Sequence, residues 1–108
     1  MARTVRWSET ATCDLTEAAE FIARDSRYYA AALVREARAA ARSLRTLSER
    51  GRVVPEARSS NVREIFVKSY RLIYWVTPNV VTVLAFVHGA RDLAALWQRR
   101  EGSPDADD

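Results

Sequence analysis

The apolar positions of the first half of the chain recur at helical spacing. Before residue 25 they are Leu15, Ala18, Ala19 and Ile22. After residue 26 a clearer stripe has steps of three and four residues, at Leu33, Ala37, Ala40, Leu44 and Leu47. This spacing predicts two amphipathic helices. Ser8 and Ser26 stand where N-cap residues are expected, and Gly51 is expected to end the second helix. The short connection predicts an antiparallel helical hairpin.

The second half of the chain has a period of two and is rich in β-branched and aromatic residues. Residues 62–68, 70–76 and 80–87 fit strands, and the short links between them predict an antiparallel meander. Residues 4–7 are a further candidate strand. Residues 52–61 contain a proline and two serines and are expected to form a loop.

These elements predict an α+β fold in which a helical hairpin packs on one face of an antiparallel sheet. A short C-terminal helix is expected around Leu93, Leu96 and Trp97. With 108 residues and 48% apolar content, the chain is large enough for one core. Residues 1–100 are therefore expected to form a single domain, and residues 101–108 an acidic, disordered tail.

Both faces of the predicted sheet are apolar. Strict alternation in the last strand places Val81, Val83 and Val87 on one face and Leu84 and Phe86 on the other. An antiparallel sheet that is free in water usually has one polar face. The apolar character of both faces therefore predicts that both are covered.

One helical hairpin can cover only one of these faces. The other face is expected to carry Ile73 and Trp75, which alternate with the remaining residues of their strand. An exposed apolar face of this size usually marks an interaction site. We expect this face to meet the C-terminal segment, another chain or both, and Ile73 and Trp75 are candidate partner contacts.

The composition excludes several classes of site. The only cysteine is Cys13 and the only histidine is His88, so an internal disulfide and a multi-histidine metal site are excluded. No apolar run approaches the ~18 residues of a membrane span, and the first residues lack the apolar stretch of a signal peptide. We expect a cytoplasmic protein that needs neither metal nor cofactor.

The net charge of +3 conceals an asymmetry along the chain. Residues 1–100 hold all 17 basic residues against 10 acidic ones, a net charge of +7, and the last eight residues carry −4. The outer face of the second predicted helix carries four arginines, Arg35, Arg38, Arg42 and Arg45. They fit either a solvated face or a docking surface for an acidic partner, because arginine pairs with carboxylates through a planar fork.

Arg71 is the most unusual charged residue, because it stands in an otherwise apolar strand. A guanidinium on the buried side of a sheet must be paired. Glu64, on the neighbouring predicted strand, is the nearest carboxylate in sequence. An internal pair between these two residues would fix the register of the sheet. His88 closes the last strand and is either a structural hydrogen-bonding residue or a proton donor.

Several segments together resemble the RelE/ParE superfamily of type II toxin–antitoxin toxins. They are DLTEAAEFIARDS, LSERGRVVPE, VREIFVKSYRLIYWV and VVTVLAFVHGARDL, which cover much of residues 3–96. The His-Gly-Ala-Arg ending looks more like the ParE branch than the RelE branch. The resemblance implies a β-α-α-β-β-β plan with the first strand beside the last. It also implies a cognate antitoxin, which neutralises the toxin.

The two branches imply different activities. ParE-like toxins inhibit DNA gyrase by binding, whereas RelE-like toxins are ribosome-dependent mRNA endonucleases, which need basic residues around one phosphate. The candidate set for RNA cleavage is Lys68, Arg71, His88 and Arg91. The acidic C-terminus would repel a phosphate backbone. We therefore expect a gyrase inhibitor without chemistry of its own, with an endonuclease and a non-toxic, antitoxin-binding relic as the alternatives.

Overall fold

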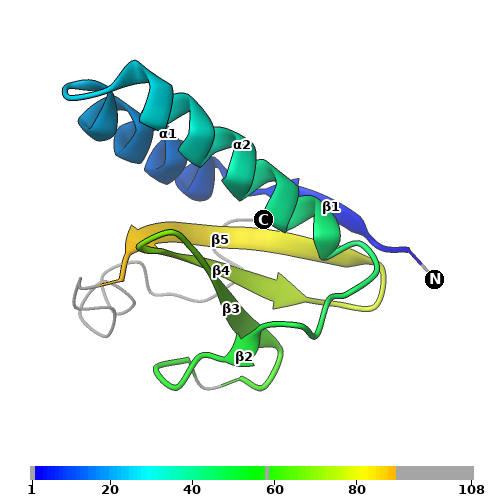
Figure 1. Ribbon diagram of the computed structural model, residues 1–108. Helices are drawn as coiled ribbons and strands as arrows, with labels where there is room; N and C mark the ends of the chain where they lie inside the picture. The colour runs from blue at the N-terminus through cyan, green and yellow to red at the C-terminus, as the bar shows by residue number, and fades with distance from the viewer. Residues whose placement is uncertain (1, 58, 90–108) are drawn as a thin grey trace.

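The computed structural model describes residues 2–57 and 59–89. Along the chain its elements are β1 (Thr4–Trp7), α1 (Glu9–Ala23), α2 (Arg27–Ser43), β2 (Arg52–Val53), β3 (Val62–Val67), β4 (Tyr70–Val76) and β5 (Val80–His88). The two helices lie together over one face of a five-stranded sheet (Figure 1). This arrangement confirms the predicted α+β class.

The sheet is mixed, with the strand order β1-β5-β4-β3-β2. β1 lies beside β5, as the family resemblance implies, and runs parallel to it, whereas the other pairs are antiparallel. The expectation of a wholly antiparallel sheet is therefore wrong for this one pair. The expected loop at residues 52–61 is also corrected at its start, where Arg52 pairs with Glu64 and Val53 with Arg63.

Both helices begin where the sequence predicts. The hydroxyl of Ser8 accepts the N–H of Ala11 at 3.0 Å, and that of Ser26 accepts the N–H of Tyr29 at 3.1 Å. Each cap satisfies one of the N–H groups that lack a partner inside the helix.

The end of α2 differs from the prediction. The helix ends at Ser43 and not at Gly51, and Leu47, predicted to belong to the apolar stripe, is 58% exposed. The N–H of Arg3 donates to the carbonyl of Arg45 at 2.8 Å, which ties the chain after the helix to the start of β1.

A β-bulge in β5 changes which residues face the helices. Ile73 pairs with Ala85 and Tyr74 with Val83, so Leu84 has no partner in β4. An extra residue reverses the alternation beyond it. Phe86 therefore joins the helix-facing cluster, and Val87 joins the cluster on the other face. The strict alternation expected for this strand is wrong after Leu84.

The start of α1 binds the bulged part of β5. The N–H of Ser8 donates to the carbonyl of Val83 at 2.9 Å, and its hydroxyl lies 3.5 Å from the carbonyl of Leu84. The carboxylate of Asp14 accepts the N–H of Phe86 at 3.0 Å. β1 pairs with β5 only as far as Val83. The helix thus supplies polar partners where the neighbouring strand has ended.

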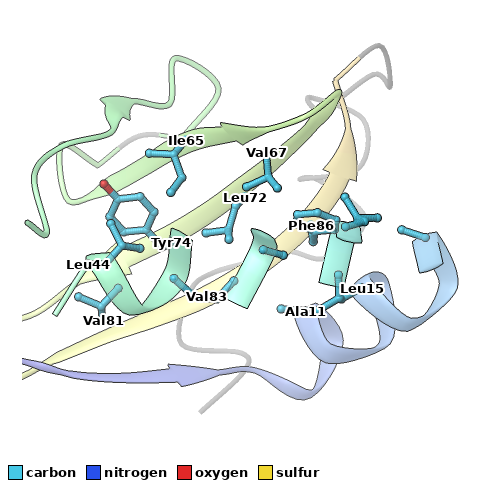
Figure 2. Close-up of a cluster of buried hydrophobic side chains, with 14 residues drawn as sticks. Ala11, Leu15, Leu44, Ile65, Val67, Leu72, Tyr74, Val81, Val83 and Phe86 are labelled. Atoms are coloured by element: carbon cyan, nitrogen blue, oxygen red, sulfur yellow. The ribbon is translucent and has the colours of Figure 1, made fainter. Parts of the chain in front are cut away.

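The main core lies between the helices and the sheet. In Figure 2, Ala11 and Leu15 of α1 lie close to Phe86 of the sheet, and Leu44, which follows α2, lies close to Tyr74 and Val81. Burying each of the larger side chains, such as Leu72 or Phe86, stabilises the fold by about 1.5–3 kcal/mol. The alanines of α1 and α2 in this core allow the helices to approach the sheet closely.

A second cluster of buried side chains lies on the other face of the sheet. It contains Val62, Ile73 and Leu84 from the strands, with Val54 and Ala57 from the segment after β2. Part of this face is therefore covered by the chain itself. The predicted C-terminal helix at residues 93–97 and the tail at residues 101–108 lie outside the described residues.

Tyr74 connects the core to the start of β2. Its ring is fully buried, and its hydroxyl accepts the N–H of Gly51 at 2.9 Å. A Cβ on residue 51 would lie 2.5 Å from the carbonyl oxygen of Glu64 and 2.6 Å from the Tyr74 hydroxyl. Gly51 is therefore required by close packing and not by the end of a helix.

We expect Tyr74→Phe to destabilise the fold, because it leaves the N–H of Gly51 without its acceptor. Leaving a buried donor unpaired costs about 1–3 kcal/mol. Urea unfolding should show this loss, with Tyr28→Phe as the control because Tyr28 is 72% exposed. Equal stabilities of the two variants would contradict this role of the Tyr74 hydroxyl.

The same hydroxyl predicts a loss of stability in alkali. Burial raises the pKa of Tyr74 above its ordinary value of 10.0, although the hydrogen bond with Gly51 opposes this. The unfolded chain then releases the proton at a lower pH than the folded chain, so stability falls as the pH rises above about 10. Unfolding measured between pH 9 and 11, in steps of about 0.5, should show a steeper loss for the wild type than for Tyr74→Phe. Parallel curves would contradict the assignment.

Candidate functional site

Arg71 lies in a network of ion pairs on the sheet face opposite the helices. Its Nε donates to Oε1 of Glu64 at 2.6 Å, and its Nη2 lies 3.5 Å from Oε1 of Glu56. Arg52 donates from its Nε to the other oxygen of Glu64 at 2.5 Å. The Glu64 side chain is fully buried and that of Arg71 is 8% exposed. The structure thus joins the two residues that the sequence pairs and adds Arg52 and Glu56.

This network holds Arg71 in its charged form. Burial alone would lower the pKa of Arg71, but hydrogen bonds and charge attraction from Glu64 and Glu56 outweigh it and raise the pKa. The guanidinium is therefore engaged with two carboxylates. Its described surroundings carry balanced charge, which does not favour binding of a phosphate.

The other candidates for RNA cleavage do not gather around Arg71. His88 pairs with Tyr70 across the strands, and their rings meet edge to face at 5.4 Å. Tyr70 in turn stacks on Phe86 of the helix-facing core at 4.9 Å. His88 thus lies on the helix side of the sheet and Arg71 on the opposite side.

Lys68 and Arg91 complete the set. Lys68 is in the turn between β3 and β4, and its Nζ lies 3.3 Å from a carboxylate oxygen of Glu36 in α2. Arg91 is outside the described residues. The described members of the set therefore do not surround one phosphate position.

Three of the four predicted arginines line a groove between α2 and β1. Arg38, Arg42 and Arg45 are exposed, and the groove has a volume of about 460 Å³. Val5, Trp7 and Ala41 are among its other lining residues. Among the described residues, none of the three arginines has an acidic ion-pair partner. The groove is therefore lined by apolar side chains together with three exposed arginines, which we call its arginine rim.

The remaining candidate partner contacts lie elsewhere. Arg35 is exposed on α2 but does not line the groove. Ile73 is fully buried in the second cluster, and Trp75 is half-buried against it. The segment that contains Val54 and Ala57 covers this part of the sheet. Ile73 is therefore a core residue and not a surface for a partner.

Sequence reasoning missed the β1 side of the groove, including Arg3. The Nε of Arg3 donates to the carbonyl of Thr77, and its Nη1 donates to the Ser48 hydroxyl, both at 2.9 Å. The signal was available in the implied position of the first strand beside the last, because that places β1 at the sheet edge. Within residues 2–57 and 59–89, no cluster of metal-ligating side chains and no helix able to cross a membrane is found.

Comparison with known proteins identifies the family. Residues 5–93 match the family model described as the ParE toxin of the type II toxin–antitoxin system parDE. The fold is similar to a solved chain of the chromosomal ParDE TA system from P. aeruginosa, with a TM-score of 0.66 and 14% identity over 81% of this chain and 96% of that chain. No curated protein matches. Because the family model spans most of the chain, this protein belongs to the ParE toxin family of type II toxin–antitoxin systems.

Proposed function

We propose that this chain arrests growth by binding and inhibiting DNA gyrase, and that a cognate antitoxin neutralises it. Membership of the ParE toxin family supports the role of toxin. The gyrase target follows from the ParE branch of the superfamily, to which the ending of β5 is similar. Both the target and the neutralisation would place the protein in the cytoplasm.

The separation of Arg71 from His88 is the observation that favours inhibition by binding over cleavage of RNA. Cleavage of RNA at the 2′-OH needs a base, an acid and cations around one phosphate. Here the sheet lies between the two residues, and the guanidinium of Arg71 is held by Glu64. This geometry favours an inhibitor that acts by contact and gives an endonuclease little support.

We expect the purified protein to inhibit supercoiling by gyrase in vitro. The measurement is relaxed plasmid converted to supercoiled plasmid by gyrase, with the toxin added at increasing molar ratio. Preincubation with the protein encoded by the neighbouring reading frame should restore the reaction. No inhibition at micromolar excess would count against gyrase as the target.

A second assay separates the proposal from the endonuclease alternative. We expect no mRNA cleavage when the protein is added to translating ribosomes, and we expect His88→Ala to remain toxic and folded, because His88 is exposed. Arg71→Ala is a poor test, because it removes one of the two arginines that pair with the buried Glu64, and removing one partner of a buried ion pair costs about 3–5 kcal/mol. Cleavage that disappears in His88→Ala would establish the alternative. Unimpaired growth on induction would identify a non-toxic relic.

The groove between α2 and β1 supports an acidic segment as the part of the antitoxin that binds. Its rim carries Arg38, Arg42 and Arg45 without acidic partners among the described residues. Exposed ion pairs contribute about 0.2–1 kcal/mol each. Several such pairs would add substantially to binding.

We therefore expect the double variant Arg38→Glu, Arg42→Glu to lose neutralisation while it stays toxic. Reversing two charges replaces attraction with repulsion at both positions, so about a tenfold loss of affinity for the antitoxin is expected. Growth on co-induction and calorimetric titration would measure it. The control is Arg35→Glu, outside the groove on the same helix, which reverses one charge instead of two. A control that loses half as much binding free energy as the double variant would show that α2 acts only through its overall charge.

A further inference from the structure

The free edge of β1 forms one wall of the arginine groove. β1 is the first strand in the sheet order and pairs only with β5 among the described strands. The N–H of Thr4 donates to Asn79 at 3.0 Å, and that of Ser8 donates to Val83 at 2.9 Å. A parallel pair uses every second residue for these bonds. Val5 and Trp7 therefore direct their N–H and C=O groups away from β5.

These outward groups lie beside the C-terminal end of α2. Arg3, the preceding outward-facing residue, already donates its N–H to the carbonyl of Arg45. This contact fixes the orientation of the edge relative to the helix. Val5 and Trp7 line the same groove as Arg42. A strand edge of this kind is a template for another strand.

The spacing of the rim matches an extended chain. Arg38 and Arg42 are four residues apart and project on the same side of α2, and Arg45 follows two residues after the helix ends at Ser43. A step of four residues advances about 6 Å along a helix. Side chains on one face of a strand repeat about every 6.6–6.8 Å. Acidic residues at alternate positions of a strand would therefore lie opposite Arg38 and Arg42, and Arg45 lines the same groove.

We propose that an acidic protein segment binds in this groove as an additional β-strand on the free edge of β1. Its backbone exchanges hydrogen bonds with Val5 and Trp7, and its carboxylates pair with Arg38, Arg42 and Arg45. The identity of this segment as part of the antitoxin rests on the proposed function. The mode of binding depends only on the groove.

The charge and the edge together exclude other occupants. A second copy of the chain would bring a second set of arginines against the first, and like charges in this position repel. A nucleic acid could pair with the arginines but could not donate to the outward carbonyls of Val5 and Trp7 through its phosphates. An acidic peptide strand satisfies both the rim and the edge.

The test uses a synthetic ten-residue peptide of alternating glutamate and valine, and the full-length protein labelled with ¹⁵N. Titration followed by NMR should give saturable shifts at β1 and the C-terminal half of α2. Hydrogen exchange should slow at least tenfold at the amides of Val5 and Trp7. Arg42→Glu with Arg45→Glu should weaken binding about tenfold or more, whereas Arg35→Glu should change it less than about threefold.

A second peptide, N-methylated at its four central residues, keeps the charges but loses its N–H donors. It should bind at least tenfold more weakly than the first. The proposal is overturned if both peptides bind equally, if the Val5 and Trp7 amides stay unprotected, if shifts do not saturate at millimolar peptide, or if these amides are already protected in the free protein. Inhibition of gyrase requires none of these results, so failure here leaves the proposed toxin activity standing, and failure of that activity leaves this mode of binding standing.

Discussion

The parallel pairing of β1 with β5 is the contact on which the rest of the molecule depends. The pairing ends at Trp7 and Val83. Ser8, the residue that follows Trp7, donates its N–H to the carbonyl of Val83 and also caps α1. Because a parallel strand must be followed by a crossover, the helical hairpin is led over one face of the sheet. The same pairing leaves the other edge of β1, beside α2, without a partner among the described strands. One strand of four residues thus places the helices and shapes the groove.

The sheet then divides the charged residues between two environments. On the helix side, Asp14 reaches the backbone of β5 and Lys68 pairs with Glu36 at the surface. On the other side, Glu64 and Arg71 form a buried pair with a fixed register. Replacing such a pair by apolar residues is often neutral for stability, whereas removing one partner is costly. The main role of the pair is therefore to fix the register between β3, which holds Glu64, and β4, which holds Arg71.

The elements that local pattern determines were predictable, and those set by contacts between distant segments were not. Ser8 and Ser26 cap the helices, as their positions require, and β3, β4 and β5 lie within a residue of the predicted ranges. The bulge at Leu84 depends on partners in α1, and no period along β5 indicates it. The end of α2 depends on β1, and the burial of Ile73 depends on Val54 and Ala57. For the candidate site, the sequence predicted the arginines but not the edge of β1 that lies beside them.

Burial separates the arginines of this chain into structural residues and residues available to a partner. Arg71 is nearly buried and has carboxylates on two sides, and the partly buried Arg3 donates to Thr77 and Ser48. The arginines of the groove rim have no acidic partner among the described residues and keep their planar donors exposed. A guanidinium binds carboxylates in a defined orientation, which a lysine does not. A rim built from arginine can therefore select the direction and spacing of an acidic strand as well as its charge.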